Sequence, residues 1–364
     1  MKLYNGTKHY NLHEMLKTAC QWNGILSERS NGKSFAVMQY CFKDAIEDDR
    51  EFALIYRMQN EITKADLDDY FTDAGLLKWL KKETGFDGVE ADRFSKELFF
   101  FEYDADGKRL RGKRCGRAFA IETQRSKKSK HFDYIYNAIF EEFITDEPYL
   151  PNEWVKFNNL LSTIFRKRTD VKVFLLGNTV SRECPYLSEF GVDIFKIKKN
   201  SINVAELRKA DGEKIRFAFE WAEAKTEEAG IFFGKASKEI VSGEWSADEY
   251  PHLFVPLKDT EILYTFYMIN NLGNSWKCVL FLHKDKRFVY VYPYDRDEVQ
   301  YVVNDVFTDA LTEDLMLKNN YFIHPKKKIH KRILEIWKAG RFLYSTNLCG
   351  TEFNNSLKRY NPFR

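Results

Sequence analysis

The sequence predicts an α/β fold: a mostly parallel β-sheet covered by helices on both faces, followed by a connector and a smaller α+β domain. In the first half of the chain, apolar runs typical of buried strands alternate with stretches whose apolar residues recur every three or four positions. Beyond about residue 195 this alternation gives way to a charged stretch, and then to three alternating segments that resemble an antiparallel meander. A chain of 364 residues also exceeds what one core usually serves. We therefore expect domains at 1–195 and 251–364, joined by a helical connector at 196–250.

The elements of the first domain follow one another closely. Residues 22–26 are expected to form the first strand, and Phe35, Met38, Phe42 and Ala45 then recur at helical spacing. The next expected elements are a strand at 52–57, an amphipathic helix at 62–82, a hairpin of strands 97–103 and 118–122, a strand at 134–140, a helix at 152–167 and a strand at 171–176. In the second domain we expect strands at 261–269, 276–283 and 287–292, followed by helices.

Composition excludes several classes of protein. With 44% apolar, 16% aromatic and 30% charged residues, the chain is expected to be ordered. No stretch approaches the roughly 18 apolar residues of a membrane span, so we expect no membrane insertion and a cytoplasmic location. The six cysteines are scattered without a Cys-x-x-Cys pair, which indicates neither a disulfide framework nor a zinc site.

The stretch "SERSNGKS" at 27–34 joins the first strand to the first helix, which is the setting of a phosphate-binding loop. In such a loop Gly32 allows close approach of the backbone, Lys33 neutralises phosphate charge and Ser34 is a magnesium ligand. Ser27 stands where the first glycine of the pattern usually lies, and Arg29 and Asn31 complete the loop. We expect ATP and Mg²⁺ to bind here; the alternative is a chance Gly-Lys-Ser in a polar turn.

A second motif follows the strand at 134–140, which ends in Glu141 and Glu142. A phosphate-loop ATPase needs two such acids, one that bonds a magnesium-bound water and one that polarises the attacking water. We assign these roles to Glu141 and Glu142 in that order, although aspartate is the common choice in the first position. The alternative is a pair of solvated acids at a strand end.

Catalysis also requires a positive charge on the γ-phosphate in the transition state. Arg166 and Arg168, just before the strand at 171–176, lie where a subunit edge would present them to a neighbour; the alternative is an ordinary surface charge. After that strand, Asn178 is placed to sense the γ-phosphate.

Two runs are rich in Lys and Arg, at 104–130 and 318–341. Such runs either contact nucleic-acid phosphates or form a solvated face. The residues that we expect to contact DNA are Lys127, Lys128, Lys130, Lys326, Lys327, Lys328, Lys331 and Arg332.

The segment "IFEEFITDEPYLPNEWVKFNNLLSTIFRKRTDVKVFLLGNTVS" (139–181) resembles the DNA-packaging motor ATPases of phi-29-type podoviruses, in which an acidic pair, a Tyr-Ile-Pro-Asn-Glu stretch, a Phe-Arg-x-Arg and a strand ending in Ser-Asn occur in the same order. The loop "SERSNGKSFA" is similar to Gly-Ala-Arg-Gly-Ile-Gly-Lys-Ser-Tyr-Ala in that family, with Arg29, Gly32, Lys33 and Ser34 retained. The resemblance is clear over about 22–190 and weaker beyond 196.

The resemblance implies a phosphate-loop ATPase of the terminase-like class that forms a ring, with five subunits the expected number, and drives double-stranded DNA through the portal of a procapsid in the host cytoplasm. The same resemblance implies that Lys33 and Ser34 bind phosphates and magnesium, that Glu141 supports the metal and that Glu142 activates water. It also implies that Arg166 is the trans-acting arginine finger. A packaging RNA is a partner that the resemblance leaves open. The second domain is expected to be a vestigial RNase H-like nuclease domain that does not cleave, because its first strand carries only Glu261 and its central strand no acid.

Two other functions compete with this one. A helicase-like ATPase would act on single strands. A basic DNA-binding scaffold would not hydrolyse nucleotide at all.

Overall fold

The computed structural model describes thirteen stretches of the chain, and every structural statement below concerns these residues. They are 1–3, 9–27, 31–127, 131–145, 149–178, 184–192, 197–208, 212–222, 250–269, 275–294, 317–318, 321–322 and 328–360. The chain divides into two compact units. The first comprises Met1–Ile144, Asn152–Thr179 and Glu189–Glu244, and the second comprises Thr145–Pro151, Val180–Ser188 and Trp245–Arg364.

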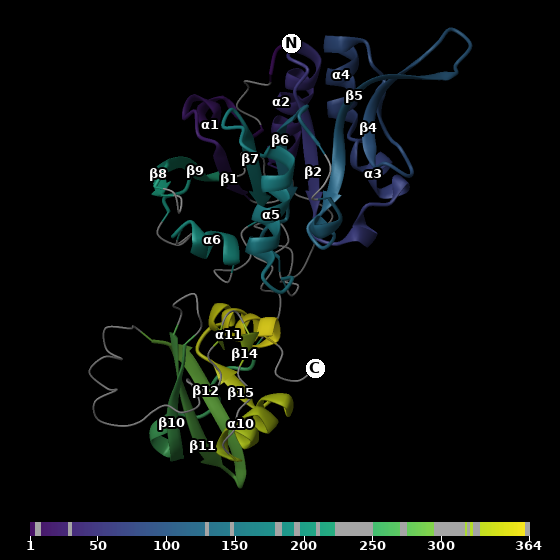
Figure 1. The fold of residues 1–364 in the computed structure, drawn as a ribbon. Coiled ribbons are helices and arrows are strands. Elements are labelled where there is room, and N and C mark those ends of the chain that lie inside the picture. Colours follow the sequence, from purple (N-terminus) through teal and green to yellow (C-terminus); the bar gives the residue numbers. More distant parts are fainter. Residues whose placement is uncertain are drawn as a thin grey trace. The chain divides into compact units, whose positions relative to one another are not determined.

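The first unit is built on a nine-stranded sheet with the order β3-β4-β5-β2-β6-β7-β1-β9-β8 (Figure 1). Its strands are β1 (Trp22–Ser27), β2 (Glu51–Tyr56), β3 (Gly88–Ala91), β4 (Glu97–Tyr103), β5 (Arg109–Ala120), β6 (Ile135–Glu141), β7 (Lys172–Gly177), β8 (Ile202–Arg208) and β9 (Lys214–Ala222). The strands from β5 to β9 in this order pair in parallel, whereas β3, β4 and β8 pair antiparallel at the two edges. The predicted mostly parallel α/β sheet is therefore confirmed.

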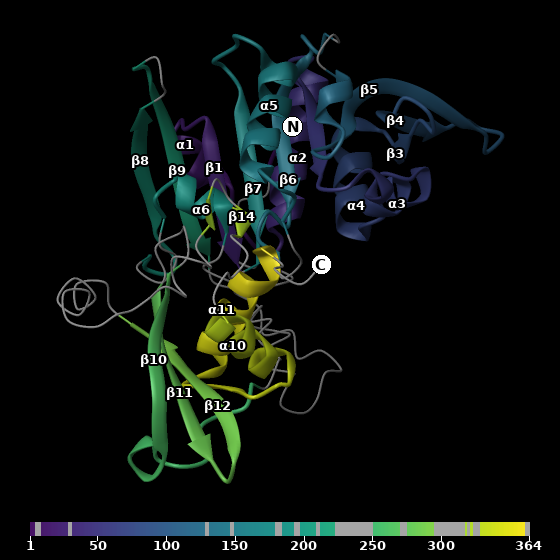
Figure 2. The same cartoon turned by 60° about the horizontal axis from the view of Figure 1, so that its bottom comes forward.

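Helices cover both faces of this sheet, as Figures 1 and 2 show for α2 and α5. The described helices of the chain are α1 (His13–Lys17), α2 (Lys33–Glu47), α3 (Lys64–Tyr70), α4 (Ala74–Thr84), α5 (Glu153–Phe165), α6 (Pro185–Glu189), α10 (Lys328–Lys338) and α11 (Asn347–Tyr360). Successive side chains of a strand point to opposite faces. Accordingly Ile139 of β6 joins the core with α2, while its neighbour Phe140 packs on Phe157 of α5 with ring centroids 5.3 Å apart.

The helix that we expected at 62–82 is two helices, α3 and α4, because two polar side chains cap separate N-termini. The Thr63 side chain accepts a hydrogen bond from the backbone N–H of Asp66 and begins α3. The Asp73 side chain accepts one from the N–H of Leu76, at 2.7 Å, and begins α4. The apolar periodicity continues through both helices, so it concealed the break.

The prediction of a helical connector at 196–250 was wrong for the part of it that the structure describes. Residues 202–208 and 214–222 are strands β8 and β9, so the main sheet extends past the predicted boundary at 195. Phe217 and Phe219 of β9 are buried beside β1, and a Cβ on Gly24 of β1 would lie 2.5 Å from the Phe219 ring. The second strand of the hairpin is also longer than expected, since β5 begins at Arg109 and not at 118.

The second unit contains a four-stranded sheet with the order β10-β11-β12-β15. Its strands are β10 (Glu261–Ile269), β11 (Ser275–His283), β12 (Lys286–Pro293) and β15 (Phe342–Tyr344), and the two-residue strands β13 (Leu317–Lys318) and β14 (Tyr321–Phe322) pair separately. The predicted meander is confirmed, and β15 pairs in parallel with β12. Trp276 of β11 and Phe353 of α11 pack edge to face at the centre of this core.

Within the described residues no three His, Cys, Asp or Glu side chains gather as a metal cluster, and the relation of this unit to a nuclease stays a prediction. No helix in the described part of the chain has the length and apolar character needed to span a membrane.

Candidate nucleotide site

The candidate phosphate loop joins β1 to α2, which is the strand-to-helix position expected for it. Gly32 adopts a left-handed conformation (φ +81°), and a Cβ there would lie 3.1 Å from the Cβ of His9. α2 begins at Lys33, so the N–H groups of its first turn point toward the loop. Ser27 is buried as the last residue of β1, and Arg29 lies outside the described residues.

A segment from the N-terminus packs against this loop. The backbone N–H of Tyr10 donates to the carbonyl of Asn31 at 2.7 Å, and the Tyr10 hydroxyl donates to Glu220 of β9 at 2.7 Å. The Asn31 side chain is 2% exposed, and neither its amide nitrogen nor its oxygen has a hydrogen-bond partner among the described residues. Buried side-chain amides nearly always have a hydrogen-bond partner. A phosphate oxygen bound in this loop would give the Asn31 amide nitrogen such a partner.

The strand order brings the loop, the acids and Asn178 together at the carboxyl-terminal ends of three parallel strands. The strands β1, β7 and β6 are neighbours and parallel, so their carboxyl ends meet at the same edge. Asn178 follows β7, between the loop after β1 and the acidic pair at the end of β6. Its side-chain oxygen accepts a hydrogen bond from Lys33 Nζ at 2.8 Å. The sensor position predicted for Asn178 thus lies in direct contact with the cation of the loop.

Glu141 is held at the same edge by two hydroxyl groups. The Tyr70 hydroxyl, at the end of α3, donates to Glu141 Oε1 at 2.5 Å, and the Ser34 hydroxyl is also hydrogen-bonded to this carboxylate. Burial raises the pKa of Glu141, while these two hydrogen bonds and the charge of Lys33 oppose the rise. Tyr70 was not foreseen from the sequence, because nothing local connects it to an acid 71 residues later.

Glu142 lies in the turn that follows β6, and its side chain is exposed. Its backbone is left-handed (φ +51°), which turns it away from the strand direction that Glu141 follows. Arg57, the residue after β2, donates from Nη2 to the carbonyl of Glu142 at 3.3 Å. Arg57 also pairs with the fully buried Glu153 of α5, with its Nε 2.9 and 3.1 Å from the two carboxylate oxygens. This ion pair, likewise not foreseen, anchors the turn that carries Glu142.

The two candidate arginines have different surroundings. Arg166 ends α5 with an exposed side chain and a left-handed backbone (φ +52°). Arg168 is half-buried: its guanidinium donates to the carbonyls of Phe132, Asp133, Ile164 and Phe165 and stacks over the Tyr136 ring. Both arginines precede β7, so they lie near the amino-terminal ends of the parallel strands. Lys33 lies near the carboxyl-terminal ends, on the opposite side of the sheet's length. Arg168 therefore has a structural role, and Arg166 is the arginine that remains exposed.

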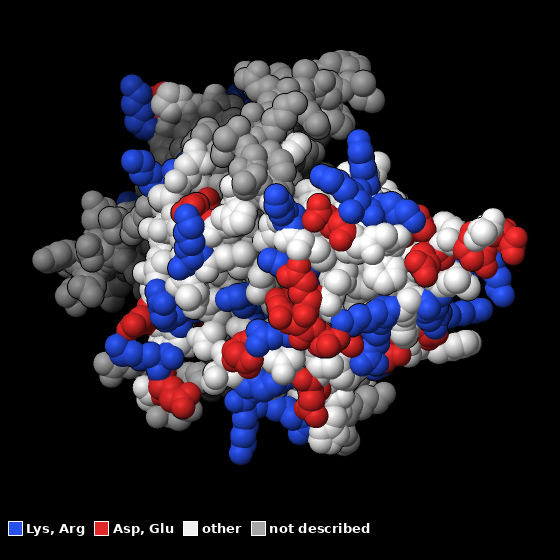
Figure 3. Space-filling view, turned by 90° about the horizontal axis from the view of Figure 1, so that it is seen from above, with Lys and Arg blue, Asp and Glu red and all other residues white. Residues whose placement is uncertain are grey.

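The first basic run is largely neutralised in the structure. Arginines of β5 form ion pairs with acids of other strands in the sheet: Arg109 and Arg111 with Glu90 of β3, and Arg114 with Glu51 of β2 and Glu97 of β4. In the view from above, Lys and Arg are interspersed with Asp and Glu over the visible face (Figure 3). The ion pairs of the β5 arginines thus leave little of their positive charge uncompensated.

The lysines and the arginine predicted to contact DNA are only partly described. Lys127 ends a short 3₁₀ helix (Gln124–Lys127), Lys328 and Lys331 lie on α10, and Arg332 is exposed on α10. Lys128, Lys130, Lys326 and Lys327 lie outside the described residues. Their contacts with DNA stay a prediction.

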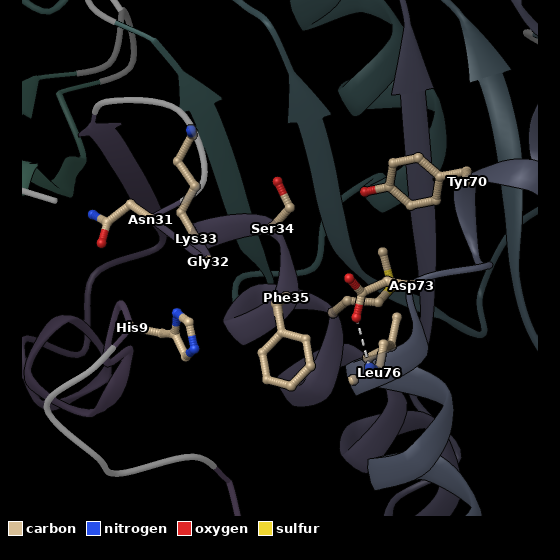
Figure 4. Close-up of a pocket in the computed structure, with 11 residues that line it drawn as sticks. His9, Asn31, Gly32, Lys33, Ser34, Phe35, Tyr70, Asp73 and Leu76 are labelled. Carbon is tan, nitrogen blue, oxygen red and sulfur yellow. Dashed lines mark hydrogen bonds between the residues drawn. The ribbon is translucent and has the colours of Figure 1, made fainter. Parts of the chain in front are cut away.

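A cavity of about 560 Å³ opens beside the loop (Figure 4). It is lined by His9, Asn31, Gly32, Lys33, Ser34, Phe35, Met38, Tyr70, Asp73, Gly75 and Leu76. A volume of this size is typical of small-molecule sites. Because Ser34 and Glu141 supply hydroxyl and carboxylate oxygens, the ligand atoms that Mg²⁺ prefers, the residues present fit a magnesium–nucleotide complex.

Comparison with known proteins gives matches over most of the chain. Residues 5–208, more than half of the chain, match the family described as Podovirus DNA encapsidation protein (Gp16). The DNA packaging proteins of Bacillus phages PZA and phi29 are 26% and 25% identical over 336 residues, which cover 89% of this chain and 89% of each relative. A chain of the bacteriophage phi-29 viral genome packaging motor assembly has the same overall fold, with a TM-score of 0.51, 19% identity and coverage of 98% of this chain and 100% of that chain. A chain of the phi-28 gp11 DNA packaging motor gives the same TM-score at 15% identity, covering 98% and 99%.

Proposed function

The chain belongs to the podovirus DNA encapsidation protein (Gp16) family, and we propose that it is an ATP-hydrolysing motor that moves double-stranded DNA into a procapsid. It would act in the host cytoplasm as a homo-oligomeric ring of five subunits docked at the portal. Its relatives are DNA packaging proteins that align over 89% of this chain, so the proposal extends to both units.

The observation that carries the proposal is the cluster at the carboxyl edge of β1, β7 and β6. There a lysine at the start of a helix contacts an amide at 2.8 Å, and a serine hydroxyl is hydrogen-bonded to a half-buried carboxylate. These are the groups that phosphate binding, phosphate sensing and magnesium binding require, and the strand order brings them together although β1 is far in sequence from β6 and β7.

Each residue of the cluster then has one task. Lys33 and the first N–H groups of α2 hold the phosphates, and Ser34 with Glu141 would hold Mg²⁺, which neutralises the charge that develops on the transferred phosphoryl group. The exposed Glu142 accepts the proton of the attacking water. Asn178, bonded to Lys33, would exchange that contact for the γ-phosphate and so report its presence.

The arginine finger comes from a neighbouring subunit in this proposal. Arg166 lies at the opposite edge of the sheet from Lys33, which prevents it from reaching the phosphates of its own chain. In a ring, that edge of one subunit can face the nucleotide of the next. A closed ring therefore supplies one arginine to every site.

DNA contacts in a packaging motor must accept any sequence, so they go to phosphates and weaken with salt. We propose Lys127, Lys128 and Lys130 for the pore, and Lys326, Lys327, Lys328, Lys331 and Arg332 for DNA, portal or a packaging RNA. We propose that the second unit does not cleave DNA with magnesium and that it only binds DNA, portal or a packaging RNA.

The test is ATP hydrolysis with and without double-stranded DNA, comparing wild type with Glu142→Gln and Arg166→Ala, each alone and then mixed. We expect hydrolysis to be stimulated by DNA, lost in each variant and partly restored on mixing, since a mixed interface can pair an intact loop and Glu142 with an intact arginine.

Other outcomes separate the alternatives. Stimulation by single strands in preference to duplex would favour the helicase-like ATPase. Absence of hydrolysis together with absence of nucleotide binding would favour the DNA-binding scaffold.

A further inference from the structure

The cavity beside the phosphate loop extends well beyond the groups that bind phosphate. Lys33 and Ser34 lie at one side of it, and the remainder is enclosed by His9, Phe35 and the segment from Tyr70 to Leu76. Phosphates occupy the loop itself, so the rest of the cavity is available to the other end of the same ligand. This inference rests on the proposed ATP-binding function and concerns the part of the nucleotide that the loop does not hold.

The walls of this space suit a flat aromatic group. Phe35 immediately follows Ser34, and Figure 4 shows its ring between His9 on one side and Asp73 and Leu76 on the other. Met38, one turn further along α2, adds apolar surface. Gly75 brings no side chain, and a Cβ at that position would lie 3.2 Å from Asp73 Oδ1 and 3.5 Å from the Phe35 ring. An open, ring-lined space is thus retained next to the phosphate site.

Asp73 supplies the polar group at this end of the cavity. Its Oδ1 accepts the N–H of Leu76 at 2.7 Å, which fixes the carboxylate at the start of α4. The second oxygen is then available to accept one hydrogen bond from a ligand. A single amino group on a planar ring matches it, whereas an oxygen at that position would be repelled.

We propose that this cavity binds the adenine base of ATP, with Phe35 packed against the face of the ring and Asp73 accepting a hydrogen bond from its 6-amino group. The two residues have separable effects. Stacking is insensitive to ring substituents, because every base has a π-face, whereas the carboxylate recognises the amino group alone.

The test compares ATP with purine riboside 5′-triphosphate, which lacks only the 6-amino group, and with inorganic tripolyphosphate, which lacks the nucleoside. Dissociation constants are measured by calorimetry with Mg²⁺, in the cold and without DNA. Wild type should bind ATP at least tenfold more tightly than the purine riboside analogue. Asp73→Asn, which preserves the helix cap because asparagine also caps N-termini, should bring that ratio close to one. Phe35→Leu should weaken both nucleotides about tenfold and leave their ratio unchanged.

Two controls keep the failures distinguishable. Asp69→Asn, at an exposed position of the preceding helix α3, should leave the ratio at its wild-type value. Tripolyphosphate should bind wild type, Asp73→Asn and Phe35→Leu equally. If tripolyphosphate binds and wild type does not discriminate between the two nucleotides, the base pocket is refuted while the phosphate site stands. If tripolyphosphate and ATP both fail to bind, the proposed ATPase function itself is refuted.

Discussion

The ion pair between Arg57 and Glu153 provides the most quantitative prediction. The Glu153 side chain is 0% exposed and that of Arg57 is 12% exposed. Replacing one partner of a buried pair leaves a desolvated charge, which typically destabilises a protein by about 3–5 kcal/mol. For Arg57→Leu we take the lower end, about 3 kcal/mol, because the Arg57 side chain is 12% exposed and water reaches one side of the pair. For a unit of this size that corresponds to a fall in Tm of roughly 6–12 °C.

The assay is thermal and urea unfolding of the full chain, followed by tryptophan fluorescence. Two further variants test the reasoning. The double variant Arg57→Leu/Glu153→Leu should recover most of the loss, since a buried pair can often be exchanged for apolar residues of similar volume. Arg50→Leu, which breaks the exposed pair with Asp170, should cost less than about 1 kcal/mol. A loss in Arg57→Leu no larger than in Arg50→Leu, or no recovery in the double variant, would refute this account of the pair.

Three further predictions concern single side chains. Tyr70→Phe should raise the Mg²⁺ concentration at half-maximal ATP hydrolysis about tenfold, because it removes a hydrogen bond from Glu141, the proposed magnesium-binding acid, whereas the neighbouring Tyr56→Phe should not. Arg168→Ala should lower the Tm and Arg166→Ala should leave it unchanged, because only Arg168 bonds four backbone carbonyls. Backbone N–H groups hold the pKa of Asp92 at about 2, so its charged form stabilises the fold above the unfolded pKa near 4. Asp92→Ala should then destabilise the protein in urea at pH 7, with a difference that shrinks as the pH falls from about 4 to about 2; a difference independent of pH would contradict this.

Much of the site was predictable because parallel strands place their carboxyl ends together. The loop at Lys33, the acids after β6 and Asn178 after β7 each follow an apolar strand, so the fold class alone implies that they meet. Their contacts with partners from other segments were not predictable. Tyr70 and Arg57 reach residues 71 and 96 positions away, and no local pattern encodes such distances.

Two errors concerned signals that were present. Asp73 precedes Ala-Gly-Leu, a sequence typical of a helix start, yet the apolar period on either side of it predicts one helix. The strand β9 reads Lys-Ile-Arg-Phe-Ala-Phe-Glu-Trp-Ala, with alternating large and small or polar residues, but its charged flanks suggested a helix. In both places a short-range polar pattern should have outweighed the average over a longer window.

The position of β7 between β1 and β6 sets the separation between the loop and the acids. Adjacent strands lie about 4.8 Å apart, so one intervening strand separates the ends of β1 and β6 by roughly 9.6 Å. Asn178, the residue after β7, lies in this interval and accepts a hydrogen bond from Lys33. β7 therefore acts as a spacer, and a ligand that contacts both Lys33 and Glu141 would also lie beside the Asn178 amide.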